Sequence, residues 1–560
     1  MGYDCSVEAI SWERVHLTII VRFWLTPPEV DEGFAFDQVQ FSLRERQRRY
    51  PVVTHHLGEG RYQLSINIAD FRSRRPVPDG TWRLIARLDG RTLKVATYPL
   101  DEVETLDERS RLFLYAQNTE SYTVSFGISE SDVRPEFLIR TYRFFRAPLE
   151  PNSKSNSALN LASDLGKRAG IALKDPRLAG VGTKVASRVL RRLFRSPGNR
   201  ILFASEMRSK LEGNLVRVRD RMLERGLDQE YEFTYSFRLP GVDESRFKNL
   251  KLMYRLCTSD IILVDDYFSV LEYLNIPKSV KVIQLWHAGS GFKSIGYSRF
   301  GKFGSPKLHN AHRRYTYAIS GSRHLVPVYA EAFGIEEKAV IPTGLPRIDT
   351  FLDPVLGAKA EDEFYRVYPQ AKDKRLILFA PTFRGRGISD AYYDYSKLDF
   401  AQLWDFCGDD TLVLFRMHHF VDEAPPIPQQ FRDRLIDVAD FPETNDLLRV
   451  ADVLITDYSS VIYEYSLLNR PMVFYAYDRE IYAATRGFHR DFELTAPGKV
   501  CDTFDELLSA LREQNFDRWK IDAFTAENFD NIDTHSADRV IDWLILGDPP
   551  ANVTSEANRP

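Results

Sequence analysis

Short apolar strands alternate with longer helical stretches from residue 199 to residue 545. The first series contains NRILFAS, DIILVDD, KVIQLW, YTYAIS and KAVIPTG. A second series begins near Arg375 and contains RLILFAPT, TLVLFRMH, RLIDV, DVLITDY and RPMVFYAYD. Buried strands that alternate with helices are typical of parallel sheets covered on both faces. The two series predict two doubly wound α/β domains facing a cleft, residues 199–345 and residues 346–545.

A different pattern occupies residues 1–147. The runs HLTIIVRFWL, RYQLSINIADF, GTWRLIARLDG and YTVSFGIS are rich in β-branched and aromatic residues, and turn sequences such as PVPDG separate them. This spacing is typical of a β-sandwich, so we expect a β-sandwich-like domain here. Its Asp, Glu and His residues are scattered and form no catalytic pattern, which favours an accessory role.

Basic residues concentrate in residues 148–198, which we interpret as a linker. Eleven basic and two acidic side chains lie between Lys154 and Arg200. The stretch KVASRVLRRLFR has helical periodicity, and its basic face includes Arg188, Arg191, Arg192 and Arg195. Such a helix is suited to an anionic bilayer surface; alternatively, it docks its apolar side on the next domain. We expect residues 546–560 to be a disordered tail.

Composition narrows the class of protein. The 560 residues are 44% hydrophobic and carry a net charge of −4, which indicates a globular chain and argues against a nucleic-acid partner. The four cysteines lack zinc spacing, so a reducing cytoplasm is expected. Charged residues near the start argue against a signal peptide, and no apolar run reaches about 18 residues, the length of a membrane span.

The residues that carry chemistry follow the predicted strands. In open α/β sheets, ligands bind outside the carboxyl ends of the strands, and five strand ends here carry cationic, hydroxyl or glycine residues. The candidates in these loops are His287, Gly289, Ser290, Gly291, Lys293, Thr343, Gly344, Arg347, Pro381, Thr382, Arg384, Arg416, His418, Asp457, Ser459 and Ser460. A purely structural turn favours Gly, Asn and Pro without so many cations.

The sequence TDYSS, residues 456–460, separates the strand DVLIT from the helical run SVIYEYSLLN. Ser459 and Ser460 occupy the expected N-cap and first turn, where unpaired amides and the helix dipole favour a phosphate. An ordinary serine N-cap is the alternative. The four other cationic strand ends favour the phosphate.

The polar set fits a diphosphate substrate. His287 follows a predicted strand and is placed to act as a general base, with a structural histidine as the alternative. Arg347 and Arg384 are suited to bidentate phosphate contacts. No carboxylate cluster accompanies them, so we expect neither a metal ion nor another cofactor. For the paired Asp265 and Asp266 we expect a strand-end cap or a positioning role, with a Mg²⁺ site as the alternative. GxGxxG and Walker A sequences are both missing, which argues against dinucleotide redox and P-loop chemistry.

An ordered set of motifs in this chain resembles the CDP-glycerol glycerophosphotransferase family, the teichoic acid primases and polymerases with their CDP-ribitol-using relatives. The set comprises IQLWHAGSGFKSIGYS, PTGLPRID, APTFRG, RMHH, ETNDLL, DVLITDYSSVIYEYSLLNRPMVFYAYD and RGFHRDFELTAPG. The resemblance covers about residues 198–540. It implies a GT-B fold, in which two Rossmann-like domains surround the active site and the second binds the CDP-alditol. It also implies transfer of glycerol phosphate or ribitol phosphate from a CDP-alditol to a hydroxyl of a lipid-linked glycan or poly(alditol phosphate), with release of CMP.

The resemblance also implies residue roles. His287 stands at the WHG-type histidine of the family, the general base, and His418 stands in its R-x-H motif, where it stabilises the diphosphate or the leaving CMP. The expected donor-phosphate contacts are Arg347, Thr382, Arg384 and Arg416, Ser459 and Ser460 match the DYSS motif, and Glu443, Asn445 and Asp446 border the nucleotide. Where many polymerases read WHGTPLK, this chain reads WHAGSGFK, so the resemblance leaves the acceptor and the product length open.

Family members work at the cytoplasmic face of the cell membrane, which favours a peripheral contact between the linker helix and an anionic membrane surface. The resemblance leaves open glycerol versus ribitol, primase versus polymerase, and teichoic acid versus capsule. Two alternatives come from other classes. One is a GT-B glycosyltransferase that uses a nucleotide sugar, and the other is a non-catalytic module whose β domain binds wall polymer. The intact His287, His418, Ser459 and Ser460 argue against the second.

Overall fold

The computed structural model describes residues 2–26, 39–45, 48–71, 75–87, 93–99, 102–103, 105–115, 120–129, 135–145, 198–239, 246–274, 276–287, 293–299, 306–308, 310–385, 391–485 and 487–549. The predicted linker helix lies outside these residues, and so does the predicted tail beyond residue 549. The chain divides into two compact units. Unit 1 holds residues 1–169, 295–313 and 331–336, and unit 2 holds residues 170–294, 314–330 and 337–560.

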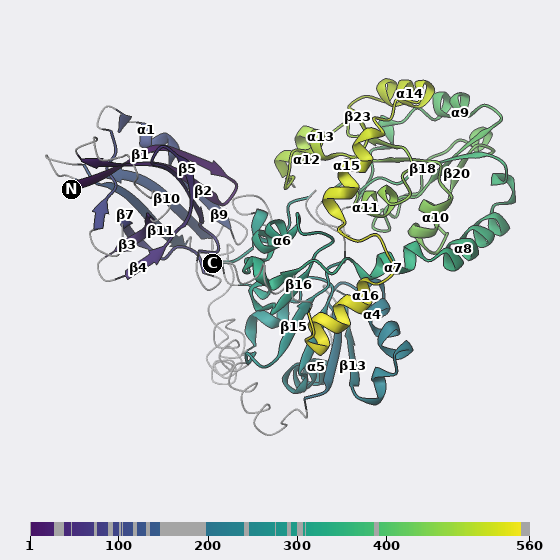
Figure 1. Ribbon diagram of the computed structural model, residues 1–560. Helices are drawn as coiled ribbons and strands as arrows, with labels where there is room; N and C mark the ends of the chain where they lie inside the picture. The colour runs from purple at the N-terminus through teal and green to yellow at the C-terminus, as the bar shows by residue number, and fades with distance from the viewer. Residues whose placement is uncertain are drawn as a thin grey trace, which may run out of the picture. The chain divides into compact units, whose positions relative to one another are not determined.

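Unit 1 contains two antiparallel sheets (Figure 1). One has the order β1-β2-β6-β5, with β1 Gly2–Glu13, β2 His16–Thr26, β6 Arg61–Asn67 and β5 Val53–Gly58. The other has the order β4-β3-β7-β11-β10-β9, with β4 Arg48–Pro51, β3 Gln40–Glu45, β7 Gly80–Arg87, β11 Phe137–Phe145, β10 Glu120–Ile128 and β9 Arg111–Tyr115, while β8 Leu93–Val95 pairs with β7. The short helix α1, Thr105–Arg109, precedes β9.

Alternating burial explains how the two sheets of unit 1 form one core. In β6, Tyr62, Leu64 and Ile66 are buried while their neighbours are partly exposed or exposed, as expected for a strand with one covered face. In β10, Val124 and Phe126 follow the same period. These five side chains belong to a single hydrophobic cluster, which also contains Trp82 from β7. The alternation read from the sequence therefore places one face of each sheet in a shared core.

Unit 2 contains two six-stranded parallel sheets. The first has the order β13-β12-β14-β15-β16-β17, with β13 Glu232–Phe237, β12 Arg200–Ser205, β14 Ile261–Val264, β15 Lys281–Gln284, β16 Tyr317–Ile319 and β17 Val340–Ile341. The second has the order β20-β19-β18-β21-β22-β23, with β20 Leu435–Asp437, β19 Thr411–Phe415, β18 Arg375–Phe379, β21 Val453–Thr456, β22 Met472–Tyr475 and β23 Lys499–Cys501. The prediction of an α/β fold with parallel sheets is confirmed. The exact domain boundaries stay a prediction.

Helices connect these parallel strands. They are α4 Gly213–Glu224, α5 Arg246–Thr258, α6 Val326–Phe333, α7 Pro346–Leu352, α8 Pro354–Val367, α9 Phe400–Cys407, α10 Thr444–Val450, α11 Ile462–Ser466, α12 Arg479–Thr485, α13 Phe492–Thr495, α14 Phe504–Glu513, α15 Trp519–Asn528 and α16 Ser536–Arg539. Local sequence sets several starts: the Asp353 carboxylate accepts two amides at the start of α8, and Thr503 and Glu506 form a capping box at α14. Within the described residues, no helix is long and apolar enough to cross a bilayer.

The end of unit 2 returns to the first parallel sheet. After α15, the chain forms α16 and a π-helix, Val540–Leu546, beside α4 (Figure 1). The ammonium of Lys281, at the start of β15, donates to the carbonyl oxygens of Leu544 and Ile545 at 2.9 and 3.0 Å. Strand periodicity does not predict this return, because the partners lie more than 260 residues apart in sequence.

Candidate active site

Each parallel sheet has a topological switch point, where the chain crosses from one side of a strand to the other. It lies between β12 and β14 in the first sheet and between β18 and β21 in the second. Ligands of doubly wound sheets bind outside the carboxyl ends of strands at such points. Asp265 and Asp266 follow β14, His287 follows the adjacent β15, and Thr382 and Asp457 follow β18 and β21. Strand order thus brings candidates distant in sequence to the same edge of each sheet.

His287 lies beside a carboxylate. Its Nδ1 is 3.1 Å from Oδ2 of Asp266, and its side chain is 37% exposed. Asp266 is itself held in place, because its Oδ1 accepts the amide of Tyr267 at 2.6 Å and its carbonyl oxygen accepts the side-chain amide of Gln284 at 2.9 Å. The contact has the distance of an ion pair, and a carboxylate beside Nδ1 favours a proton on that nitrogen, which leaves Nε2 as the nitrogen able to accept one.

The residue before His287 has a strained backbone. Trp286 has φ 47°, in the left-handed region that a bulky side chain rarely adopts. Its indole is buried, and the Trp286 and His287 ring centroids are 4.8 Å apart. Such strain costs about 1–3 kcal/mol and persists only where the surrounding structure over-determines it, often at functional sites. The backbone conformation at the end of β15 is therefore imposed by its tertiary neighbours.

Asp265 and Asp266 are adjacent in sequence but have different partners. The Asp265 carboxylate is fully buried and lies 2.9 Å from Nε of Arg208, which follows β12. Burial raises the pKa of Asp265, and the charge of Arg208 opposes that rise. Asp266 instead lies against His287. Among the residues that the structure describes, no group of three His, Cys, Asp or Glu side chains is arranged to hold a metal ion.

In the second sheet, Asp457 joins the two switch-point loops. Its Oδ1 accepts the amide of Thr382 at 2.7 Å and the amide of Tyr458 at 2.5 Å. Its Oδ2 accepts Nη1 of Arg384 at 2.7 Å. The carboxylate is almost fully buried. Asp457 therefore acts as a structural connection between the loop after β18 and the loop after β21, rather than as an exposed ligand.

Arg384 lies between two carboxylates. Its Nη1 bonds Asp457 and the carbonyl oxygen of Thr382, and its Nε and Nη2 bond the two oxygens of Asp478. The rings of four tyrosines surround the guanidinium at 5.2–5.9 Å, namely Tyr393, Tyr458, Tyr477 and Tyr482. Burial alone would lower the pKa of Arg384, but the two carboxylates outweigh burial and raise it. This geometry favours a structural role, and a phosphate contact by Arg384 stays a prediction.

Ser459 and Ser460 do not cap a helix, so the predicted N-cap is wrong. The helix α11 begins at Ile462, its N-cap residue is Val461, and it makes no side-chain capping bond. The amide of Tyr463 bonds the carbonyl oxygen of Ser460 at 3.3 Å, so both serines belong to the turn before the helix. Both are partly exposed. Their contact with phosphate stays a prediction, and any such contact comes from the loop before α11, since both serines precede its first residue.

The loop after His287 is described only at its ends. Gly289, Ser290 and Gly291 lie outside the described residues. Lys293, at the far end of the loop, pairs with Phe488 in a β-bridge, and its Nζ lies 3.4 Å from Oγ1 of Thr382. Lys293 thus brings a cation to the switch point of the second sheet, where the Thr382 side chain is almost fully buried.

His418 is held in a neutral form. Its Nδ1 accepts the amide of Phe420 at 3.2 Å, so the proton of the neutral ring belongs on Nε2. Its ring packs against Phe383 with centroids 4.8 Å apart. Burial, followed by the nearby charges of His419 and Lys293, lowers the pKa of His418 to about 3. At neutral pH His418 is therefore a hydrogen-bond donor through Nε2 and carries no positive charge.

Two predicted phosphate-binding arginines have protein partners. The guanidinium of Arg347, in α7, pairs with the buried carboxylate of Glu464 in α11. Burial raises the pKa of Glu464, and Arg347 opposes that rise. Arg416 donates to Oγ1 of Thr444 at 3.2 Å and to the carbonyl oxygens of Val438 and Ala439. Arg347 thus joins α7 to α11 and Arg416 joins the loop after β19 to the residues before and in α10, and their phosphate contacts stay predictions.

A cavity of about 690 Å³ lies beside these arginines. Its lining includes four residues that the sequence singled out, namely Arg347, Glu443, Asn445 and Asp446. Burial raises the pKa of both Glu443 and Asp446. Arg208, the partner of Asp265, and Gly213, the first residue of α4, also line the cavity. Elements of both parallel sheets therefore contribute to one hollow within unit 2.

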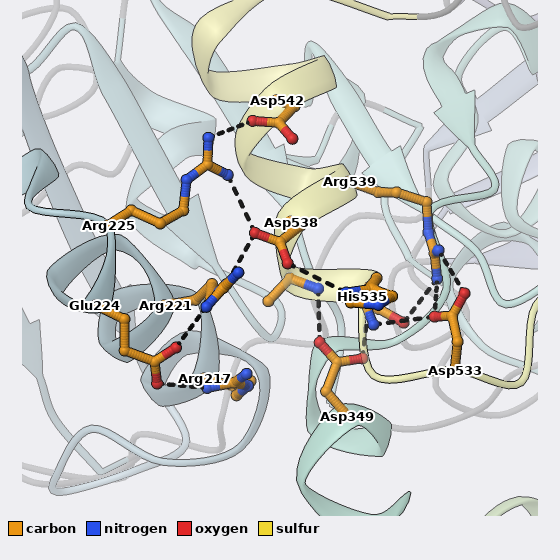
Figure 2. Close-up of polar contacts among 12 residues, drawn as sticks. Arg217, Arg221, Glu224, Arg225, Asp349, Asp533, His535, Asp538, Arg539 and Asp542 are labelled. Carbon is orange, nitrogen blue, oxygen red and sulfur yellow. Dashed lines mark hydrogen bonds and ion pairs between the residues drawn. The ribbon is translucent and has the colours of Figure 1, made fainter. Parts of the chain in front are cut away.

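The turn Thr343–Arg347 is held by the C-terminal return. Nε of Arg539 donates to the carbonyl oxygen of Thr343 at 2.6 Å. The two Nη atoms of Arg539 bond the carboxylate of Asp533 at 2.8 and 2.9 Å (Figure 2). A Cβ on Gly344 would lie 2.4 Å from Oγ of Ser536, so this close approach requires glycine. Packing thus explains Gly344 without a substrate, and Thr343 is likewise fully buried. Contacts of these two residues with substrate stay predictions.

Several residues that shape the site were not singled out from the sequence. They are Arg208, Asn214, Glu464 and Asp478. Asn214 and Glu464 lie at buried helix positions. Asn and Glu rarely occupy such positions without a hydrogen-bond or ion-pair partner, so their presence in an otherwise apolar helical stretch indicates that a partner exists. The partner itself cannot be read from a single sequence.

Pro381 lies in the described loop after β18, beside the Thr382 that bonds Asp457.

Comparison with known proteins adds independent information. A family model described as CDP-Glycerol:Poly(glycerophosphate) glycerophosphotransferase matches residues 186–546, more than half of the chain. The chain is 38% identical over 506 residues to the teichoic acid poly(ribitol-phosphate) polymerase of Bacillus spizizenii, a match that covers 87% of this chain and 78% of that protein. It is 40% identical over 347 residues to the teichoic acid ribitol-phosphate polymerase TarL of Staphylococcus aureus, covering 61% of this chain and 62% of that protein.

Other matches are more distant. Relatives named for glycerol phosphate are 27–30% identical to this chain. Among solved structures, that of the wall teichoic acid polymerase TagF is similar with a TM-score of 0.53 and 21% identity, covering 72% of this chain and 100% of that chain. At this identity the likeness establishes the fold alone, and it agrees with the two parallel sheets described above.

Proposed function

This chain belongs to the CDP-glycerol:poly(glycerophosphate) glycerophosphotransferase family, and we propose that it is a transferase of teichoic acid synthesis that moves an alditol phosphate from a CDP-alditol to a hydroxyl of a membrane-linked acceptor. The proposed donor is CDP-ribitol. Relatives named for ribitol phosphate are 37–40% identical to this chain, whereas those named for glycerol phosphate are 27–30% identical.

The proposed architecture is of the GT-B type, preceded by a sandwich-like accessory domain. Two doubly wound parallel sheets and a C-terminal segment that returns to the first sheet support the GT-B arrangement. The shared core of the two antiparallel sheets in unit 1 supports the accessory sandwich. This finer assignment is our proposal, since the described contacts define the sheets without assigning a domain type.

The observation that carries the proposed chemistry is the pair formed by His287 and Asp266 at the carboxyl end of the first sheet. Nδ1 of His287 faces Oδ2 of Asp266 at 3.1 Å, which leaves Nε2 to accept a proton. Asp266 stabilises the imidazolium that forms during transfer. A half-exposed histidine with an oriented ring and a carboxylate behind it is suited to deprotonate an alcohol.

The proposed step forms one bond and breaks one. The acceptor oxygen attacks the phosphorus that carries the alditol, while its proton moves to Nε2 of His287. The bond between that phosphorus and the oxygen bridging to CMP breaks, and CMP leaves with the bond's electrons. Such phosphoryl transfer depends mainly on positioning and on stabilisation of charge on the phosphate oxygens.

Donors at the second sheet are proposed to stabilise this charge. His418 offers an Nε2 proton, because its Nδ1 already accepts the amide of Phe420. Lys293 offers a positive charge at the Thr382 loop. The neighbouring cavity, lined by Glu443, Asn445 and Asp446, is proposed to border the nucleotide. The hydrogen-bond donor His418 and the cation Lys293 are together suited to stabilise the negative charge that develops on the diphosphate as CMP leaves.

The test of function is CMP release from a panel of donors with and without a lipid-linked acceptor. The panel contains CDP-ribitol, CDP-glycerol, a UDP-sugar and a GDP-sugar. We expect acceptor-dependent CMP release to be fastest with CDP-ribitol. Turnover of a nucleotide sugar without CMP release would instead support the alternative of a GT-B glycosyltransferase. Product length, measured on gels, distinguishes a primase from a polymerase.

The enzyme is further proposed to bind the cytoplasmic membrane surface through Arg188, Arg191, Arg192 and Arg195, which lie outside the described residues. Each basic residue near an anionic surface contributes about 1 kcal/mol. Changing all four to Glu is expected to abolish co-sedimentation with phosphatidylglycerol vesicles. The control changes four exposed arginines elsewhere to Glu, namely Arg22, Arg48, Arg61 and Arg366, which alters net charge equally. Equal co-sedimentation of the two variants would contradict the proposal.

A further inference from the structure

Asn214, the second residue of α4, connects two loops of the candidate site. Its side chain is buried, with 1% of the residue exposed. Its Nδ2 donates to the carbonyl oxygens of Leu285 and Trp286 at 2.9 and 2.5 Å, and its Oδ1 accepts the amide of Arg347 at 2.9 Å. One carboxamide thus bonds the chain immediately before His287 and the first turn of α7.

The orientation of this carboxamide follows from its partners. Two carbonyl oxygens require donors, and a backbone amide requires an acceptor, so only one assignment of the nitrogen and oxygen satisfies all three. Loss of a buried hydrogen-bonding side chain leaves each of its partners unsatisfied, which destabilises the folded state. The arrangement is therefore specific for Asn, because Asp lacks the donors and Leu lacks every polar atom.

The carbonyl of Trp286 belongs to the peptide bond that it shares with His287. Fixing that carbonyl fixes the plane of the peptide and thus the positions of the His287 nitrogen and Cα, from which the side chain extends. Trp286 has the left-handed φ of 47°, a conformation that needs external support. Asn214 supplies that support from α4, while Asp266 orients the imidazole ring from the loop after β14.

The helix that carries Asn214 is itself anchored. Arg221, near the end of α4, and Arg225, its C-cap residue, bond the carboxylates of Asp538 and Asp542 in the C-terminal return (Figure 2). On the facing helix, Asp349 of α7 accepts the amides of Ser536 and Ala537 at 2.9 and 2.8 Å. Both helices joined by Asn214 are thus held by the same C-terminal segment, which makes the carboxamide a fixed point from which to position a neighbour.

We propose that Asn214 is a positioning residue for alditol phosphate transfer, which holds the Trp286–His287 peptide in the orientation that presents His287 to the acceptor hydroxyl. The proposal rests on the proposed function, in which His287 is the base. Asn214 has no contact with substrate in this role. It acts through the backbone on His287 and, through the amide of Arg347, on the first turn of α7.

The experiment compares Asn214→Ala with Asn528→Ala in CMP release from CDP-ribitol. Asn528 is a matched control, because it is also 1% exposed and donates its Nδ2 to a backbone carbonyl, that of Phe524, at 2.7 Å. A small misplacement of a catalytic group costs up to about 100-fold in rate. We expect Asn214→Ala to lower kcat about 10- to 100-fold with KM for the donor changed less than about threefold. We expect Asn528→Ala to keep kcat within about threefold, although it too lowers Tm by removing a buried hydrogen bond.

A double-variant cycle separates positioning from general structural damage. If Asn214 acts through His287, then Asn214→Ala in a His287→Ala background lowers kcat less than about threefold, because the positioned base is already missing. A full 10- to 100-fold loss in both backgrounds would overturn the proposal, and so would a normal kcat in Asn214→Ala. If the unaltered enzyme releases no CMP from any CDP-alditol, the proposed function fails instead, which is a distinct result.

Discussion

The two parallel sheets of unit 2 hold the residues at their carboxyl ends in opposite ways. Beside the first sheet, His287 is 37% exposed, follows a left-handed tryptophan and has one carboxylate at its ring. At the second, Arg384 is buried, and its three nitrogens bond two carboxylates and a backbone carbonyl. The first sheet thus carries a partly exposed histidine next to a strained backbone. The second carries an arginine whose hydrogen-bond donors are paired with protein groups.

This difference indicates a division of labour. A buried network whose donors and acceptors are all paired can fix the geometry of loops, but it leaves no group to react with a substrate. A half-exposed histidine can exchange a proton, yet it needs neighbours to keep it oriented. We therefore expect changes at His287 and Asp266 to alter kcat, and changes in the network around Arg384 to alter stability.

The largest expected effect comes from removing the base. His287→Ala is expected to lower kcat for CMP release about 10²- to 10⁴-fold, because general base catalysis contributes that much. Its free energy of unfolding should change by less than about 1 kcal/mol, since the side chain is half exposed. Steady-state kinetics and urea unfolding measure both quantities. His55→Ala, at an exposed strand position, is the control. Undiminished kcat in His287→Ala would remove the assignment.

The second sheet is tested by Arg384→Met. This change leaves the buried Asp457 and the partly buried Asp478 without their cation, which is expected to lower the free energy of unfolding by about 3–5 kcal/mol. Urea unfolding at pH 7 measures the loss. The control is Arg366→Ala, which breaks an exposed ion pair with Glu363 and should cost less than about 1 kcal/mol. Equal losses in the two variants would contradict a buried network at the second switch point.

A smaller effect is expected when the histidine keeps its place but loses its carboxylate. Asp266→Asn should lower kcat about 10- to 100-fold while KM for the donor stays within about threefold, because the neutral amide no longer stabilises the imidazolium. The matched control is Asp409→Asn, whose carboxylate is almost fully exposed. A larger rise in KM than fall in kcat would show that Asp266 binds substrate rather than supporting His287.

The smallest expected effect is a pH dependence of stability at the second sheet. The pKa of His418 is lowered to about 3, so between about pH 6.5 and 3 the unfolded chain binds a proton that the folded chain does not. His418 therefore lowers stability as the pH falls through this window. His418→Asn keeps an acceptor for the Phe420 amide and removes the titration. The free energy of unfolding of both proteins is measured in urea at pH 7 and at pH 5.5. Its decrease between these two pH values should be about 1 kcal/mol smaller for His418→Asn than for the unaltered enzyme. Parallel pH profiles would contradict this account.

The sequence predicted most of the strands that place the site. Val453–Thr456 and Arg375–Phe379 are short apolar runs followed by polar loops, a pattern that identifies a buried parallel strand. The N-cap at Ser459 and Ser460 was wrong, because helix boundaries read from pattern shift by a residue or two and α11 begins at Ile462. The role of Asn214 was missed, since its three partners lie in segments 71 to 133 residues away.

Local chemistry along the chain was sufficient for the α/β class, the parallel sheets and the residue types at the strand ends, because side-chain period and turn composition act over a few residues. Folding in three dimensions settled which of those residues are available to a substrate. In the sequence, Arg384 and His287 look alike, because each is a polar residue after a strand. In the structure, Asp478, 94 residues from Arg384, forms an ion pair with the arginine. Asp266 lies beside the ring of His287, which stays partly exposed. Burial and charge depend on such distant partners, and these determine whether a polar side chain supports the structure or carries out the reaction.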